Sequence, residues 1–234
     1  MPYKKAFIIS LGGSLIVPQS GIDYKFLKKF RELILKEIKK GNKFFIVTGG
    51  GDTARKYIRG ANKIVRVKDE DCDWLGIHAT RLNAHLIRTI FRKSAHSEII
   101  TNPTVKLKQP LKNKVSELVV ASGFRPGNSS DYVATLLAEK YNVKNVINLS
   151  NIDYVYDKDP KKFKTAKKLK EINWRDFRKI VGSKWSPGLS GPFDPIASKK
   201  AQDLELKVAI MNGKKLKNLE NYIEGKGFKG TIIQ

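Results

Sequence analysis

The glycine-rich turns of this sequence are its most informative candidates for a functional site, because their backbone N–H groups are free to bind a ligand. The apolar run at residues 44–47 predicts a buried strand, and it ends in three consecutive glycines at 49–51, whose backbone N–H groups no side chain shields. Asp52 or Thr53 can cap a short helix that carries Arg55. Taken alone, this is also compatible with an ordinary turn between a strand and a helix. A helix N-terminus, bare peptides and a cation at one point nevertheless favour a site for an anion such as phosphate.

Three further apolar runs end in similar turns. They are residues 7–11 before Gly12 and Gly13, residues 118–121 before the loop 122–130, and residues 146–149 before the turn 150–153. Since the carboxyl ends of parallel strands share one edge of an open α/β sheet, we expect the four turns to lie side by side. Such an edge would suit one or two ligands that carry several phosphates.

The composition places the chain among globular proteins. Its 234 residues, 41% of them hydrophobic, suffice for one sizeable α/β domain or two small ones. No apolar run approaches the roughly 20 residues of a membrane span. Gly12 and Gly13 interrupt the apolar N-terminal segment and no cleavage site follows, so we expect a first strand and a cytoplasmic protein. The single cysteine, Cys72, excludes an internal disulfide and fits a reducing compartment.

The charge balance is strongly basic. The chain has 46 Lys and Arg against 22 Asp and Glu, a net charge of +24, which favours anionic partners and raises the question of nucleic acid. The densest run, residues 158–170, holds seven lysines but only one aromatic residue. Base stacking requires several aromatic rings among the charges, so we expect a solvated lysine-rich surface and no nucleic-acid partner.

Two acids and one lysine are candidates for roles beyond structure. Asp131 opens a helix directly after the loop 122–130, where it either caps the helix or positions cations beside the anion site. Asp73 ends the acidic run at residues 69–73 and lies where a long helix begins. Lys199 lies one turn inside a helix that begins at Asp194, close enough to reach a phosphate.

The long helix has an apolar periodicity, which predicts its buried face. That face is Leu75, Ala79, Leu82, Leu86 and Ile90. Thr80 and Asn83 on the same helix either face solvent or lie near the ligand edge.

Several common site types are absent from the sequence. It has no GxxxxGK[ST] phosphate loop, no protein-kinase motif set, no GxSxG, and no histidine pair at zinc spacing, so we assign no protein metal ligand. The glycines at GxGxxG spacing near the C-terminus lack a preceding strand. The loop 183–195 is rich in Pro and Gly and is expected to close over a ligand. The chemistry that remains is phosphoryl transfer, which needs alignment and charge neutralisation.

Seven motifs in order resemble the amino-acid kinase superfamily. They are LGGS (11–14), GGGDTAR (49–55), DWLGIHATRLNA (73–84), PGNSSDYVATLLAE (126–139), SNIDYVYDKDP (150–160), DPIASKKA (194–201) and the terminal GTI (230–232). Within that superfamily the motifs most resemble the uridylate (UMP) kinases, in particular the archaeal-type branch. The match runs from residue 7 to residue 232.

This resemblance implies a fold and an activity. The fold is a single-domain three-layer α/β/α sandwich with a mainly parallel sheet, commonly assembled as a hexamer. The activity is transfer of the γ-phosphate of Mg-ATP to UMP, a step of pyrimidine nucleotide biosynthesis. Residues from 1 to about 140 would bind the phosphoryl acceptor, and residues from about 141 to 234 would bind ATP.

The resemblance also implies roles for individual residues. Lys199 would neutralise the transferring phosphoryl group, and Asp131 would organise the site. The residues matching the ATP side are Gly12, Gly13, Gly51, Arg55, Ser150, Tyr156 and Asp159. The residues matching the UMP side are Gly50, Asp73, Phe124, Arg125, Pro126, Gly127, Asn128, Ser129 and Ser130. Mg²⁺ would be held mainly by nucleotide phosphates and water.

Two residues depart from the family pattern. Ser10 stands where many relatives have a lysine, although the archaeal-type branch often lacks it, and Tyr154 replaces a glycine near the adenine side. Two alternatives therefore remain. One is a sister kinase of the same fold acting on a substrate such as isopentenyl phosphate, and the other is a catalytically impaired homologue that binds nucleic acid through its charge.

Overall fold

A computed structural model describes residues 4–105, 107, 117–184 and 191–234. Its centre is a seven-stranded sheet in the order β3-β2-β1-β4-β8-β9-β7. The strands are β1 (Ala6–Leu11), β2 (Lys43–Thr48), β3 (Leu118–Ala121), β4 (Asn145–Ser150), β7 (Glu171–Ile172), β8 (Lys207–Asn212) and β9 (Thr231–Ile233). Every pairing in the sheet is parallel except that of β8 with β9. The predicted mainly parallel sheet is confirmed.

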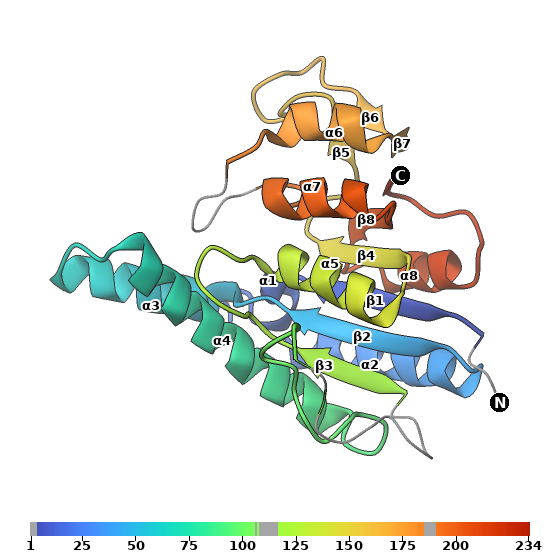
Figure 1. Ribbon diagram of the computed structural model, residues 1–234, viewed down its shortest axis with the longest axis horizontal. Coiled ribbons are helices and arrows are strands. Elements are labelled where there is room, and N and C mark those ends of the chain that lie inside the picture. Colours follow the sequence, from blue (N-terminus) through green and yellow to red (C-terminus); the bar gives the residue numbers. More distant parts are fainter. Residues whose placement is uncertain (1–3, 106, 108–116, 185–190) are drawn as a thin grey trace.

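Helices cover both faces of this sheet (Figure 1). They are α1 (Gly13–Ile16), α2 (Tyr24–Lys39), α3 (Gly51–Ile64), α4 (Asp69–Ile90), α5 (Ser130–Tyr141), α6 (Trp174–Val181), α7 (Pro195–Asp203) and α8 (Leu216–Ile223). Alternate strand residues enter two cores, with Phe44 packing beside α2, α4 and α8, and Phe45 packing beside α5, α6 and α7. The predicted three-layer α/β/α sandwich is therefore confirmed. Among the described residues, no helix has the length and apolar character needed to span a bilayer.

The glycine turns meet at the carboxyl edge of the sheet, as predicted. The Gly12 N–H donates to the Leu149 carbonyl at 2.9 Å, and the Gly49 N–H donates to the Leu11 carbonyl at 3.0 Å. A Cβ on Gly13 would lie 2.0 Å from the Gly51 nitrogen, so only glycine fits there. Gly51 itself has φ +67°, a conformation that glycine adopts at little cost. The turns after β1 and β2 thus lie in backbone contact.

The sequence analysis did not predict several short elements. Strand β9 and helix α8, which both follow β8, were not predicted. A separate antiparallel pair, β5 (Val155–Tyr156) and β6 (Lys168–Leu169), was also not predicted. Strands of two or three residues are too short to show a period, which explains why the pattern missed them.

The predicted buried face of α4 was only partly right, since Ala79 is buried and Leu86 and Ile90 pack, partly buried, against the core. The helix buries Ile77, Ala79, Thr80, Asn83, Ala84 and Ile87. Leu82, expected inside, is 64% exposed. The face is rotated because Thr80 and Asn83 bind backbone groups of two neighbouring turns, as described below. Polar residues that satisfy buried peptides belong inside, although periodicity counts them as surface.

The N-cap expected for α3 was also wrong. The helix begins at Gly51, two or three residues earlier than a cap at Asp52 or Thr53 would place it, and has no side-chain cap. Asp52 lies in its first turn and is fully buried. It forms ion pairs with Arg55, Lys56 and Arg59 on the same helix.

Candidate active site

A cavity of about 350 Å³ opens where the turns after β2 and β3 meet α4 and α7. The N-termini of α3, α5 and α7 all reach it through Gly51, Ser130 and Asp194. Each helix N-terminus presents unpaired N–H groups and a partial positive charge. Three of them at one cavity favour a ligand with several negative charges.

Polar side chains of α4 hold the turns in place. The Asn83 amide donates to the carbonyls of Gly49 at 2.8 Å and Gly50 at 3.2 Å. The Thr80 hydroxyl accepts from the Gly123 N–H at 2.7 Å. Of the two alternatives for this pair, exposure to solvent is excluded, because both residues are buried, Thr80 lines the cavity and Asn83 binds a turn that lines it. Their hydrogen bonds fix the backbone conformation of the turns after β2 and β3.

Asp73 joins α4 to the loop 122–130. Its carboxylate accepts from the Gly127 N–H at 2.7 Å, and Asp73 and Asn128 both line the cavity. Gly127 has φ +77°, which directs the loop back toward the helix. Asp73 is therefore placed both to shape this loop and to accept a hydrogen bond from a ligand hydroxyl.

Asp131 faces the cavity and does not cap its helix. The cap of α5 is Ser129, whose hydroxyl accepts from the Tyr132 N–H at 3.1 Å. The Asp131 carboxylate instead accepts from the Ser10 hydroxyl at 2.8 Å and from the Asn148 amide at 2.9 Å. Of the two alternatives left open by the sequence, the cap is thus excluded.

The electrostatic environment of Asp131 is unusual for an acid. Burial raises the pKa of its carboxyl to about 6, and the negative charge of Asp194 adds to that rise, while the hydrogen bonds from Ser10 and Asn148 oppose it. Among the described residues, no lysine or arginine forms an ion pair with it. The carboxylate is therefore uncompensated unless a cation enters the cavity.

Asp194 is a second acid of the same cavity, and it is buried. One carboxylate oxygen caps α7 by accepting from the N–H groups of Ile196 at 2.6 Å and Ala197 at 3.0 Å. The other oxygen, Oδ2, is buried and has no hydrogen-bond partner among the described residues. A buried carboxylate oxygen without a donor is costly, which favours a cation nearby during function.

The predicted cations take different positions. Arg55 lines the cavity, where it pairs with Asp52 at 3.4 Å. Lys199 is on α7 but its side chain is exposed and it is not among the residues that line the cavity. Its neighbour Lys200 pairs with Glu139 at 2.7 Å.

The structure gathers only part of the predicted set around this cavity. The predicted residues that line it are Gly50, Gly51, Arg55, Asp73, Asn128, Ser129, Ser130 and Asp131. Those outside its lining are Gly12, Gly13, Phe124, Arg125, Pro126, Gly127, Ser150, Tyr156, Asp159 and Lys199. Gly12 and Gly13 nevertheless contact the turns that line it. Residues 185–190 of the expected closing loop lie outside the described residues, whereas Gly191 and Phe193 line the cavity.

Tyr154, the departure near the predicted adenine side, is also outside this lining. The Lys168 ammonium lies 5.4 Å from the centre of its ring, within the range of a cation–π contact. Asp159, in the same region, accepts from the Lys161 N–H at 2.9 Å and so shapes the turn after β5.

Sequence reasoning missed Ser10, Asn148 and Asp194 as members of the site. Ser10 and Asn148 are opposite each other on the paired strands β1 and β4, in the register Ser10 to Asn148. A polar residue inside each of two apolar strands was a usable signal, because such residues are buried only with a partner.

Comparisons with known proteins agree with this geometry. The family model described as "Amino acid kinase family" matches residues 5–212. A uridylate kinase of Methanococcus aeolicus is 33% identical over 97% of this chain and 98% of its own length. One from Sulfurisphaera tokodaii is 36% identical over 87% and 89%, respectively.

Solved structures give the same result. The crystal structure of a uridylate kinase from Archaeoglobus fulgidus superimposes with a TM-score of 0.79 at 30% identity, covering 97% of this chain and 99% of that one. A UMP kinase from Bacillus anthracis, 22% identical with a TM-score of 0.77, shares the fold. The resemblance seen in the seven motifs is confirmed, and the chain belongs to the amino acid kinase family.

Proposed function

We propose that this chain is a uridylate kinase that transfers the γ-phosphoryl group of ATP to UMP, giving UDP and ADP. The observation that carries the proposal is the cavity at which three helix N-termini, bare glycine turns and the two acids Asp131 and Asp194 converge. Relatives named uridylate kinase match over nearly the whole chain, which supports UMP as the acceptor.

The two halves of the chain then divide the substrates. Residues from 1 to about 140 form one part, in which Gly50, Asp73 and the loop 124–130 bind UMP. Residues from about 141 to 234 form the other, in which Ser150, Tyr156 and Asp159 bind ATP. Gly12, Gly13, Gly51 and Arg55 lie between them and receive the ATP phosphates. The backbone contact between the turns after β1 and β2 supports this arrangement, because it places both sets of N–H groups together.

The transfer itself needs no protein nucleophile. An oxygen of the UMP phosphate forms a bond to the γ-phosphorus while the bond from that phosphorus to the bridging oxygen of ADP breaks. The helix N-termini, Arg55 and Lys199 stabilise the charge spread over the transferred group. Asp131 holds the cations in position, itself fixed by Ser10 and Asn148.

The site fits Mg²⁺ as the partner of ATP. Carboxylate oxygens are ligands that this ion prefers, and the buried Oδ2 of Asp194 has no donor of its own among the described residues. Nucleotide phosphates would hold most of the ion's coordination, with Asp131 and Asp194 as the protein groups available to it. When bound, Mg²⁺ supplies neutralisation of phosphate charge.

We further propose that the enzyme acts in the cytoplasm as a homohexamer. Large apolar side chains exposed on α3 and α4, among them Tyr57, Ile64 and Leu82, support subunit contacts there. Helix α3 and the first part of α4 extend from the body of the molecule (Figure 1). Light scattering coupled to size exclusion would give the mass, and a monomer at micromolar concentration would contradict the assembly.

An ADP-release assay tests the function directly. We would supply Mg-ATP with UMP, CMP, dUMP, isopentenyl phosphate or N-acetylglutamate in turn. UMP should give the highest kcat/KM by a clear margin. A higher value for isopentenyl phosphate would assign a sister kinase. No turnover with any acceptor, together with duplex binding that persists at 200 mM salt, would assign a nucleic-acid-binding homologue, since nonspecific electrostatic binding weakens steeply with salt.

A further inference from the structure

A second groove, of about 370 Å³, lies at the opposite edge of the sheet. Lys5, Asn145 and Lys207 line it from the amino ends of β1, β4 and β8, and Tyr222, Lys226 and Phe228 line it from α8 and the segment that follows. The glycine turns are at the carboxyl ends of these same strands. Six residues of strand at about 3.3 Å each separate the two sites by roughly 20 Å.

The wall of this groove is aromatic. The rings of Tyr222 and Phe228 pack edge to face with centroids 4.8 Å apart. Burial raises the pKa of the Tyr222 hydroxyl to about 12, so it remains a donor at neutral pH. The flat faces of such rings suit a planar apolar group.

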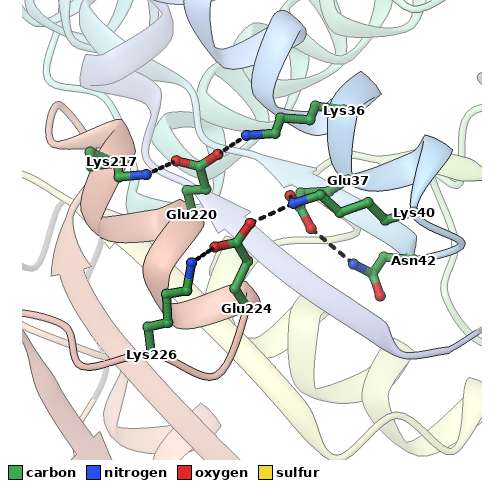
Figure 2. Close-up of polar contacts among 8 residues, drawn as sticks. All are labelled: Lys36, Glu37, Lys40, Asn42, Lys217, Glu220, Glu224 and Lys226. Atoms are coloured by element: carbon green, nitrogen blue, oxygen red, sulfur yellow. Dashed lines mark hydrogen bonds and ion pairs between the residues drawn. The ribbon is translucent and has the colours of Figure 1, made fainter.

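The charged residues of the groove are all lysines. No acid lines it, and among the described residues neither Lys5 nor Lys207 forms an ion pair. The adjacent surface between α2 and α8 is different, because Lys36, Lys40 and Lys217 each contact a glutamate there (Figure 2). Within the groove, Lys226 contacts Glu224 at 2.7 Å, whereas among the described residues the positive charges of Lys5 and Lys207 have no counter-ion.

The segment that carries Lys226 and Phe228 is held firmly. Gly225, with φ +76°, ends α8, and the Lys226 N–H returns to the Asn221 carbonyl at 2.8 Å. The Asn218 side chain donates to the Lys229 carbonyl and accepts from the Lys229 N–H, both at 2.6 Å. A wall fixed in this way costs little further ordering when a ligand binds.

We propose that this groove is a second ligand site, for a planar aromatic anion of the nucleoside phosphate class. The phosphates contact Lys5 and Lys207, and the base packs on Tyr222 and Phe228. The proposal is independent of the reaction proposed for the first cavity, because none of these residues belongs to it.

The test measures binding while the first cavity is filled. Protein saturated with UMP and ADP is titrated with N-methylanthraniloyl-GTP, and the fluorescence gives affinity and stoichiometry. We expect one binding event per chain, weakened at least tenfold in the double variant Lys5→Ala/Lys207→Ala and also in Tyr222→Leu. Inorganic pyrophosphate should compete with the probe, and uridine should compete only weakly.

A matched control separates a local site from general charge. The double variant Lys28→Ala/Lys63→Ala removes the same charge from α2 and α3, away from the groove, and should bind like the unmodified chain. The proposal would be overturned if both double variants lost affinity for the fluorescent nucleotide equally. It would also be overturned if the protein saturated with UMP and ADP did not bind that nucleotide. Since Lys5 and Lys207 lie outside the first cavity, unchanged ADP release with UMP verifies that the groove variant is folded.

Discussion

Two clusters of acids in this molecule are built in opposite ways. At the carboxyl edge of the sheet, Asp131 and Asp194 are held by neutral donors, namely a hydroxyl, an amide and backbone N–H groups. Between α2 and α8, Glu37, Glu220 and Glu224 are held by lysines (Figure 2). Only the second cluster contains its own counter-ions.

The pKa values follow this difference. Lys226 and Lys40 lower the pKa of Glu224 to about 2, whereas burial raises that of Asp131 to about 6. The three glutamates have the spacing of a metal site, yet four lysines already neutralise them. The comparison indicates that uncompensated charge, more than the number of acids, distinguishes a functional site from a structural one.

Replacement of Lys199 by alanine should have the largest effect, because this lysine is our candidate for the cation that the first cluster lacks. We expect kcat to fall by about 10² to 10³, the usual loss when one charge-stabilising donor is removed. Steady-state ADP release measures it. Lys200→Ala is the control, since Lys200 pairs with Glu139 on the same surface, and it should keep near-normal kcat. Near-normal kcat in Lys199→Ala would remove this lysine from the mechanism.

The Asp131→Asn variant should be more stable than the unmodified chain at pH 8 in the absence of nucleotide and metal. In the folded chain this carboxyl keeps its proton up to about pH 6, whereas the unfolded chain loses it near the ordinary value of 3.8. The folded state therefore loses stability as the pH rises between these values, and the loss persists above them. This difference in pKa between the folded and the unfolded chain corresponds to at most about 3 kcal/mol in the free energy of unfolding.

Urea unfolding from pH 4 to pH 8 would measure this gain. The free energy of unfolding of Asp131→Asn should exceed that of the unmodified chain most at pH 8, and the difference should vanish near pH 4. A constant difference at every pH would mean that Asp131 titrates normally and that the first cluster is compensated by a group not identified above.

The fold was largely predictable from the sequence, because each long strand combines an apolar run with a glycine or small polar turn. Asp131 was predictable as well, since an acid beside a phosphate-suited loop is unusual. Its contact with Ser10 was not, because these residues are 121 positions apart and meet only through the pairing of β1 with β4. The prediction of the buried face of α4 was in part wrong for a related reason. Thr80 and Asn83 are buried because they form hydrogen bonds, which a hydrophobic periodicity does not reveal.

Ser10→Ala should have an intermediate effect on activity. The hydroxyl donates to the Asp131 carboxylate at 2.8 Å and lowers its pKa, so its loss should raise that pKa further. A hydrogen bond to a charged group is worth about 1.5 kcal/mol or more, so we expect kcat to fall about tenfold. The pH at which half the activity is lost on acidification should move upward. Ser122→Ala, just after strand β3 and two strands away from β1 in the sheet, serves as control and should change neither kcat nor this pH.

Glu220→Gln should have the smallest effect, and with the opposite dependence on pH. Lys217 and Lys36 lower the pKa of Glu220, so its contribution to stability is present above its ordinary value of 4.5 and disappears as the pH falls below it. Because both lysines are largely exposed, we expect a loss of only about 0.5 to 1 kcal/mol at pH 7, reduced by salt, with unchanged kcat. Urea unfolding at pH 7 in low and high salt would measure it. A fall in kcat would contradict the separation of the two clusters, because it would couple a self-neutralised ion-pair network on one side of the sheet to the uncompensated acids at its edge.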